Sequence, residues 1–155
     1  MKQRESILVS ACLLGEACRY DGKSFPCEAV QVLADNYNLV PVCPEQLGGL
    51  PTPRTPSEIQ PDRRVIDREG VDRTAAFIAG AQATLDIARE HGCTRAILKA
   101  KSPSCGVHDI YDGSFTGNVV SGQGITAALL READMNLSDE HDLSSTSEHD
   151  ERRNL

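Results

Sequence analysis

Three short apolar segments that each run toward a cysteine constrain the fold of this chain more than any other feature. The segments are residues 7–11, 38–43 and 94–100. They are short, apolar and rich in branched residues, which indicates buried strands. The cysteines at or just beyond their carboxyl ends are Cys12, Cys43 and Cys105. If the strands are parallel neighbours, the three thiols meet at one edge of one sheet, where open α/β sheets bind ligands.

The segments between these strands predict helices and long loops. Apolar spacing predicts helices over residues 26–37 and 74–91, and a last helix opens near Thr126. This order predicts an α/β fold, a single small Rossmann-like domain with a mostly parallel sheet flanked by helices. Residues 44–72 hold five prolines and three glycines and are expected to form a long functional loop. The Asp-Gly pair within residues 110–115 predicts a tight hairpin turn.

The charge of the chain is concentrated at its carboxyl end. The 155 residues carry a net charge of −7, and residues 132–155 hold eight acids and two arginines. We therefore expect an α/β domain over residues 1–133 and an acidic disordered tail over residues 134–155. The overall charge disfavours nucleic-acid binding, whereas the nearly neutral body leaves room for a local basic pocket that takes a small anion.

The sequence also indicates a compartment. No apolar run approaches the roughly 20 residues of a membrane span. The amino terminus is charged and has no signal-peptide region. We expect a cytoplasmic protein without a membrane partner, in which six cysteines are not a disulfide framework.

Three converging thiols leave several interpretations open. A closed zinc site or an electron-transfer iron–sulfur cluster usually takes four protein ligands, so three would leave one metal position free. Simple burial of the thiols and a nucleophilic cysteine are the alternatives. For the remaining cysteines we expect packing roles, least firmly for Cys18, which is nearer to the predicted edge than Cys27 or Cys93.

Polar residues surround the predicted edge. Glu45 follows Cys43 by two positions, and residues 102–106 combine two serines with a tight turn suited to anions or sulfur. Gly48 and Gly49 would let the backbone approach a ligand closely. The basic residues of the same edge are Arg19, Lys23, Arg54, Lys99 and Lys101.

Five ordered motifs carry a resemblance to a known family. They are SerAlaCysLeuLeuGly at 10–15, ArgTyrAspGly at 19–22, the Pro-Val-Cys-Pro-Glu segment at 41–54, LysSerProSerCysGly at 101–106 and TyrAspGlySerPheThrGly at 111–117. Together they resemble the thiouracil desulfidase family over roughly residues 6 to 131.

The resemblance implies a cofactor and a reaction. It implies a 4Fe-4S cluster held by Cys12, Cys43 and Cys105 with one iron open, and redox-neutral removal of sulfur from 2-thiouracil or 4-thiouridine monophosphate. The substrate would be a small thiolated pyrimidine or its nucleotide, and the oligomeric state stays open. On this hypothesis Glu45 acts as general base on water, and Ser102 hydrogen bonds the ring or relays a proton. The candidate substrate-binding residues are Arg19, Lys23, Gly48, Gly49, Arg54, Lys101 and Ser104.

Two competing functions remain at this point. In one, Cys105 is a nucleophile activated by the turn amides and by His108. In the other, the chain is a non-catalytic metal-binding module whose acidic tail recruits a partner.

Overall fold

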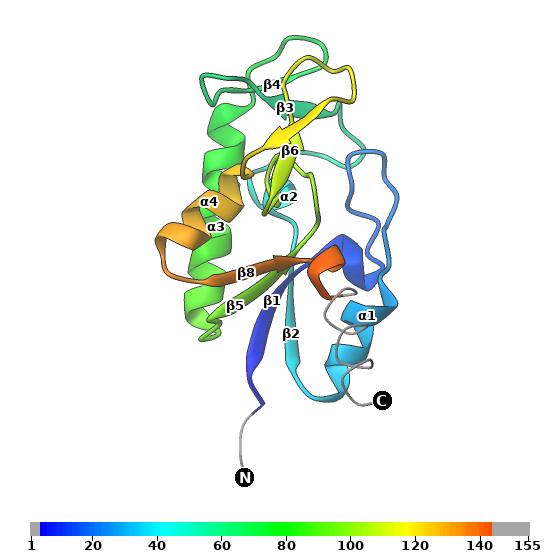
Figure 1. Ribbon diagram of the computed structural model, residues 1–155, viewed down its shortest axis with the longest axis vertical. Coiled ribbons are helices and arrows are strands. Elements are labelled where there is room, and N and C mark those ends of the chain that lie inside the picture. Colours follow the sequence, from blue (N-terminus) through cyan, green and yellow to red (C-terminus); the bar gives the residue numbers. More distant parts are fainter. Residues whose placement is uncertain (1–3, 144–155) are drawn as a thin grey trace.

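The computed structural model describes residues 4–143, and a four-stranded parallel sheet forms its centre (Figure 1). The strand order is β2-β1-β5-β8. These strands are β1 (Ser6–Ser10), β2 (Asn38–Val42), β5 (Arg95–Leu98) and β8 (Asn136–Asp139). The three strands that precede the predicted thiol cluster are therefore parallel neighbours, and the predicted α/β fold class is confirmed.

Helices cover both faces of this sheet. They are η1 (Ala11–Leu14), α1 (Glu28–Gln31), η2 (Val32–Asp35), α2 (Pro44–Leu47), α3 (Thr74–Glu90) and α4 (Ile125–Glu132). Figure 1 shows α3 and α4 together on one side of the sheet and α1 on the other. The strand pleat explains this division, because successive side chains point to opposite faces. Leu8 packs in one cluster with Leu85 and Leu130, whereas Val9 packs in another with Val30.

The first predicted helix is shorter than expected. Residues 26–37 form only one α-helical turn, α1, followed by the 3-10 turn η2. Val30 alone is fully buried in these two elements, while Val32 is exposed. The segment therefore has too little apolar surface against the sheet to support a longer amphipathic helix.

Two antiparallel hairpins extend beyond the carboxyl edge of the sheet. Their strands are β3 (Ser57–Ile59), β4 (Val65–Asp67), β6 (Asp109–Tyr111) and β7 (Val119–Ser121). The predicted long loop thus contains α2, β3 and β4. The Asp112-Gly113 pair lies in a longer connection rather than a two-residue turn. Glu58 explains this, since its Oε1 accepts hydrogen bonds from the backbone N–H groups of Gly113 and Phe115 and ties the connection to β3.

The predicted boundary at residue 133 is wrong. Strand β8 pairs in parallel with β5, so part of the predicted disordered tail completes the sheet. The acidic residues here have structural partners: Asp139 Oδ1 accepts from the backbone N–H of His141 and Asp142, and Glu140 Oε2 lies 3.1 Å from Lys99 Nζ. The predicted tail beyond residue 143 lies outside the described residues. None of the helices in the described part is long and apolar enough to cross a membrane.

Candidate active site

A cavity of about 570 Å³ lies at the carboxyl edge of the sheet. It is lined from several directions, by the ends of β1, β2 and β5, by the segment around Arg54, and by His141 beyond β8. This is the edge at which parallel α/β sheets bind ligands, because the connecting loops meet there. The fold therefore brings the predicted thiols into one cavity wall.

Four thiols line this cavity, one more than the sequence predicts. Cys12 belongs to η1 directly after β1, Cys43 follows β2, and Cys105 lies in the turn after β5. The fourth is Cys18, which is 5% exposed and whose thiol interacts with those of Cys12 and Cys43. In the sequence, Cys18 was marked only by its position in the loop that follows the first strand. This position alone does not distinguish a site residue from a cysteine packed in the core.

The thiols are held in an environment that disfavours the free thiolate. Hydrogen bonding to the Cys12 thiol and burial raise the pKa of Cys18 to about 11. The Cys18 thiol and burial likewise raise the pKa of Cys43. Burial raises the pKa of Cys105 to about 11, although Ser10 and Ser104 oppose the shift through hydrogen bonds. A cationic metal group bound here would displace these protons, because thiolates are the ligands.

The cavity thiols do not form a compact set for a single ion. A tetrahedral zinc site with bonds of about 2.3 Å places its sulfur ligands roughly 3.8 Å apart. In residues 4–143, no three cysteine sulfurs all lie within 4.8 Å of one another. The donor set of the cavity is soft and sulfur-based, and thiolates of this kind are the ligands that an iron–sulfur cluster takes.

Glu45, in the first turn of α2, is one of two glutamates that line this cavity, and the other is Glu58. Its Oε1 accepts a 2.9 Å hydrogen bond from Arg54 Nε, and its Oε2 accepts one of 3.0 Å from Ser104 Oγ. The ion pair is well enclosed, with side-chain exposures of 7% for Arg54 and 14% for Glu45. Two fixed partners hold the carboxylate in a single orientation beside the thiols.

The serine turn after β5 forms a hydrogen-bonded chain that ends on Glu45. Ser102 Oγ accepts from the backbone N–H groups of Ser104 and Cys105, so its own proton is available to Ser104 Oγ at 3.0 Å. Ser104 Oγ in turn donates to Glu45. The direct hydroxyl partner of Glu45 is thus Ser104, and Ser102 acts on it through Ser104.

Arg54, which the sequence predicts to hold substrate, makes its hydrogen bonds to other residues of the protein. Besides Glu45, it donates through Nη1 to Pro51 O and Thr52 Oγ1, and through Nη2 to Cys18 O. All three nitrogens are engaged within the protein, so the guanidinium has a scaffolding role in the site.

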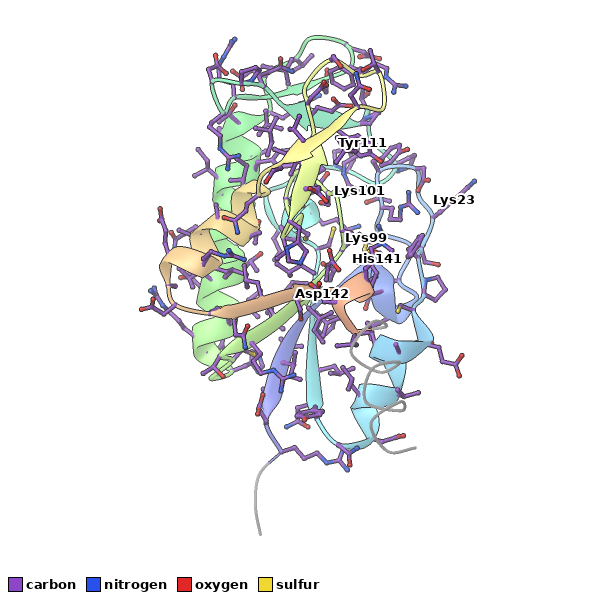
Figure 2. All side chains as sticks on the ribbon, viewed as in Figure 1. Lys23, Lys99, Lys101, Tyr111, His141 and Asp142 are labelled. Carbon is purple, nitrogen blue, oxygen red and sulfur yellow. The ribbon has the colours of Figure 1, made fainter. Side chains whose placement is uncertain are left out.

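The other predicted basic residues separate into two groups. Arg19, Lys99 and Lys101 line the cavity. Lys23 is exposed and points away from the molecule, as Figure 2 shows, and it does not line the cavity. His141, toward the middle of the same view, lines the cavity and was not predicted, because its segment was assigned to the tail.

Gly48 and Gly49 serve the fold rather than the ligand. A Cβ on Gly48 would lie 2.0 Å from Ala76 O, so this glycine allows α2 to pack directly on α3. Gly49 has a φ of +95°, which a glycine adopts without strain. Neither lines the cavity, and their contact with substrate stays a prediction.

In the alternative function, His108 would activate Cys105 as a nucleophile, but it lies outside the cavity. His108 Nε2 lies 2.7 Å from Asp142 Oδ2, and the histidine does not line the cavity. Cys105, the predicted nucleophile, has a raised pKa, which lowers its thiolate fraction at neutral pH. Within residues 4–143, no histidine is placed to activate this cysteine by a hydrogen bond to its thiol.

Comparison with known proteins shows the family of this chain. A family model described as 2-thiouracil desulfurase matches residues 7–142, nearly the whole described part. The chain belongs to the 2-thiouracil desulfurase family. The match extends through β8, in agreement with the corrected boundary. The family resemblance seen in the five motifs is confirmed.

Two individual relatives of this family support the assignment. The protein YbbK of Bacillus subtilis (strain 168), named as uncharacterized, is 40% identical over 147 residues, which span 89% of this chain and 97% of that protein. A solved structure of the 4Fe-4S-dependent thiouracil desulfidase TudS is 42% identical and has a TM-score of 0.85. That match covers 92% of this chain and 95% of the TudS chain.

Proposed function

We propose that this chain is a 4Fe-4S-dependent desulfidase that replaces the sulfur of a thiolated uracil by oxygen. The reaction joins a thiocarbonyl and water and releases hydrogen sulfide, so no electrons are exchanged. Two observations carry this conclusion together: family membership, and a half-buried, doubly anchored Glu45 that lines the same cavity as the thiols.

The cluster would be held by Cys12, Cys43 and Cys105. Each follows one of three neighbouring parallel strands, and all three line the cavity. When bound, a cluster with three thiolate ligands supplies an open iron that acts as a Lewis acid on the carbon–sulfur bond.

Glu45 is assigned the role of general base. Its carboxylate accepts a proton from a water that attacks the ring carbon, a task that needs a fixed acceptor within hydrogen-bond reach of that water. Arg54 and Ser104 fix the two oxygens, so the carboxylate does not have to reorient before proton transfer. Enclosure of the ion pair strengthens both contacts relative to a solvent-exposed pair.

The serine turn is assigned the positioning of Glu45. Ser102 Oγ donates to Ser104 Oγ, which donates to Glu45 Oε2, so both hydroxyls are directed toward the carboxylate. The proton that Glu45 takes up therefore passes from the carboxyl group itself to the departing sulfur or the ring nitrogen. In this arrangement Ser104 holds the carboxylate, and Ser102 keeps Ser104 aligned.

The cavity has room for more than a pyrimidine base. Its volume of about 570 Å³ lies within the usual range for small-molecule sites, roughly 300–1,000 Å³. Arg19 and Lys101 bring positive charge to its wall in a chain that is acidic overall. A thiolated uridine monophosphate therefore suits the cavity, with its phosphate near these two cations.

Anaerobic reconstitution followed by two measurements tests this function. We expect about four irons and four acid-labile sulfides per chain, as for one bound 4Fe-4S cluster. The reconstituted protein should release sulfide from 2-thiouracil or 4-thiouridine monophosphate without added reductant. A protein that takes up zinc in place of iron, or that needs reductant for each turnover, contradicts the proposal.

A further inference from the structure

Cys18 is a fourth thiol at a site for which only three ligands are proposed. It is buried beside Cys12 and Cys43, and its thiol interacts with both of theirs. Its backbone is fixed as well, because Cys18 O accepts hydrogen bonds from Arg54 Nη2 at 2.9 Å and from the Cys43 thiol at 3.6 Å. Hydrogen bonds within the site therefore hold Cys18 close to Cys43.

The two thiols differ in their access to solvent. Cys43 is half-buried and lines the cavity, whereas Cys18 is 5% exposed. Both line the cavity, and Cys43 is the more accessible of the two to a small oxidant that enters it. Neighbouring thiols can close a disulfide by two successive exchange steps, although the raised pKa of Cys43 slows the first of them.

We propose that Cys18 is a resolving thiol that forms a reversible disulfide with Cys43 when the chain holds no cluster. The oxidant is a small disulfide such as glutathione disulfide. Cys43 sulfur attacks it, one glutathione leaves with the Cys43 proton, and a mixed disulfide remains. Cys18 sulfur then displaces the second glutathione, which takes the Cys18 proton. Two protein thiols are oxidised, and one glutathione disulfide is reduced to two glutathiones.

The consequence rests on the proposed function, in which Cys43 is a cluster ligand. A Cys18–Cys43 disulfide removes that ligand, so cluster loading must wait until a thiol reductant restores it. The bond also protects Cys43 from oxidation to sulfinic acid, which is irreversible for most proteins. Disulfide formation in the empty site would make cluster assembly responsive to the thiol redox state.

Mass mapping of the cluster-free chain after incubation with glutathione disulfide tests the bond. We expect a loss of about 2 Da, the mass of two hydrogens, on conversion of two thiols to a disulfide. Cleavage after Glu16, Lys23 and Glu28 places Cys12, Cys18, Cys27 and Cys43 on separate peptides, so the linked peptides identify the pair. The Cys27→Ser variant, which alters a half-buried cysteine outside the cavity, should behave as wild type.

The Cys18→Ser variant provides the decisive contrast. Without the resolving thiol, Cys43 should stay as a glutathione mixed disulfide, heavier by about 305 Da. A Cys12–Cys43 bond in this variant overturns the proposal. In the wild-type chain, a Cys12–Cys18 bond or the absence of any internal disulfide overturns it as well. The proposal also fails if an oxidised chain with a mapped Cys18–Cys43 disulfide takes up as much iron as the reduced chain. Failure of the reduced wild-type chain to take up iron would instead count against the proposed function, and the mapped bond would still stand.

Discussion

Glu45 and Ser104 are 59 residues apart in the chain, and Ser104 Oγ donates a 3.0 Å hydrogen bond to Glu45 Oε2. This contact joins the segment after β2 to the turn after β5. Arg54 binds the other carboxylate oxygen, so three segments that come together only in the folded chain fix one acid. The predictions below follow from this network, from the thiols beside it and from the packing that supports both.

Replacement of Glu45 by Gln should remove catalysis but not the cluster. The amide keeps the size of the side chain and loses the basic oxygen, so kcat should fall by about 10²-fold or more, the usual contribution of a general base. Iron per chain should equal that of wild type. The control is Glu16→Gln, an exposed residue that does not line the cavity. A Glu45→Gln enzyme with a near wild-type rate would exclude Glu45 as the base.

Replacement of Arg54 by Lys should resemble the loss of Glu45 function. A lysine has one nitrogen and cannot donate to Glu45, Thr52 and Cys18 in the directions that the guanidinium does. We therefore expect kcat to fall for both 2-thiouracil and 4-thiouridine monophosphate. KM for the nucleotide should change little. The matched variant Lys101→Ala should show the opposite, a raised KM for the nucleotide alone. If Arg54→Lys raises KM selectively for the nucleotide, Arg54 binds phosphate.

Removal of Cys105 should abolish cluster binding. Cys105→Ala deletes one of the three proposed ligands, so iron per chain after anaerobic reconstitution should fall to background. Cys93→Ala is the control, because Cys93 is buried in the core among residues such as Leu85 and lies outside the cavity. That variant should retain the full iron content. Equal iron in both variants would place the cluster elsewhere.

A methyl group on Gly80 should destabilise the fold. The added Cβ would lie 1.9 Å from Pro44 O, where α3 packs against α2. Alanine normally favours a helix over glycine by about 1 kcal/mol, but overpacking of this kind costs about 1–3 kcal/mol or more. We expect Gly80→Ala to lower the free energy of unfolding in urea, and to lower kcat because Pro44 precedes Glu45. The exposed neighbour substitution Ala79→Gly should cost about 1 kcal/mol by helix propensity alone and leave kcat unchanged.

The contact between His108 and Asp142 should make stability depend on pH. Hydrogen bonding to Asp142 raises the pKa of His108 above 6.5, and the charges of Asp142, Asp139 and Asp109 act in the same direction. The protonated histidine thus stabilises the folded chain below about pH 6.5, and this contribution disappears as the pH rises through the raised pKa. The difference in unfolding free energy between wild type and His108→Gln should therefore be larger at pH 6 than at pH 9. It should stay within about 1 kcal/mol, because the pair is partly exposed. A difference that does not change with pH would contradict this assignment.

Local patterns predicted the strands and the thiols that follow them. Apolar runs such as residues 7–11 signal buried strands because both faces of a parallel sheet are covered, and parallel strands place their carboxyl ends at one edge. This was enough to bring Cys12, Cys43 and Cys105 together. The acidic segment after residue 133 was misread, because its charged composition concealed that Asp139 and Glu140 accept hydrogen bonds from backbone N–H groups.

The sequence by itself determined the α/β class, the thiol edge and the presence of Glu45 beside it, since these depend on periodicity and on short separations along the chain. Only the tertiary structure decided that Cys18 joins the thiols, that Arg54 anchors Glu45 and that Gly48 supports helix packing. Such contacts depend on how distant segments approach one another. Their energetic value comes from burial and from hydrogen-bond geometry, neither of which is encoded in local residue spacing.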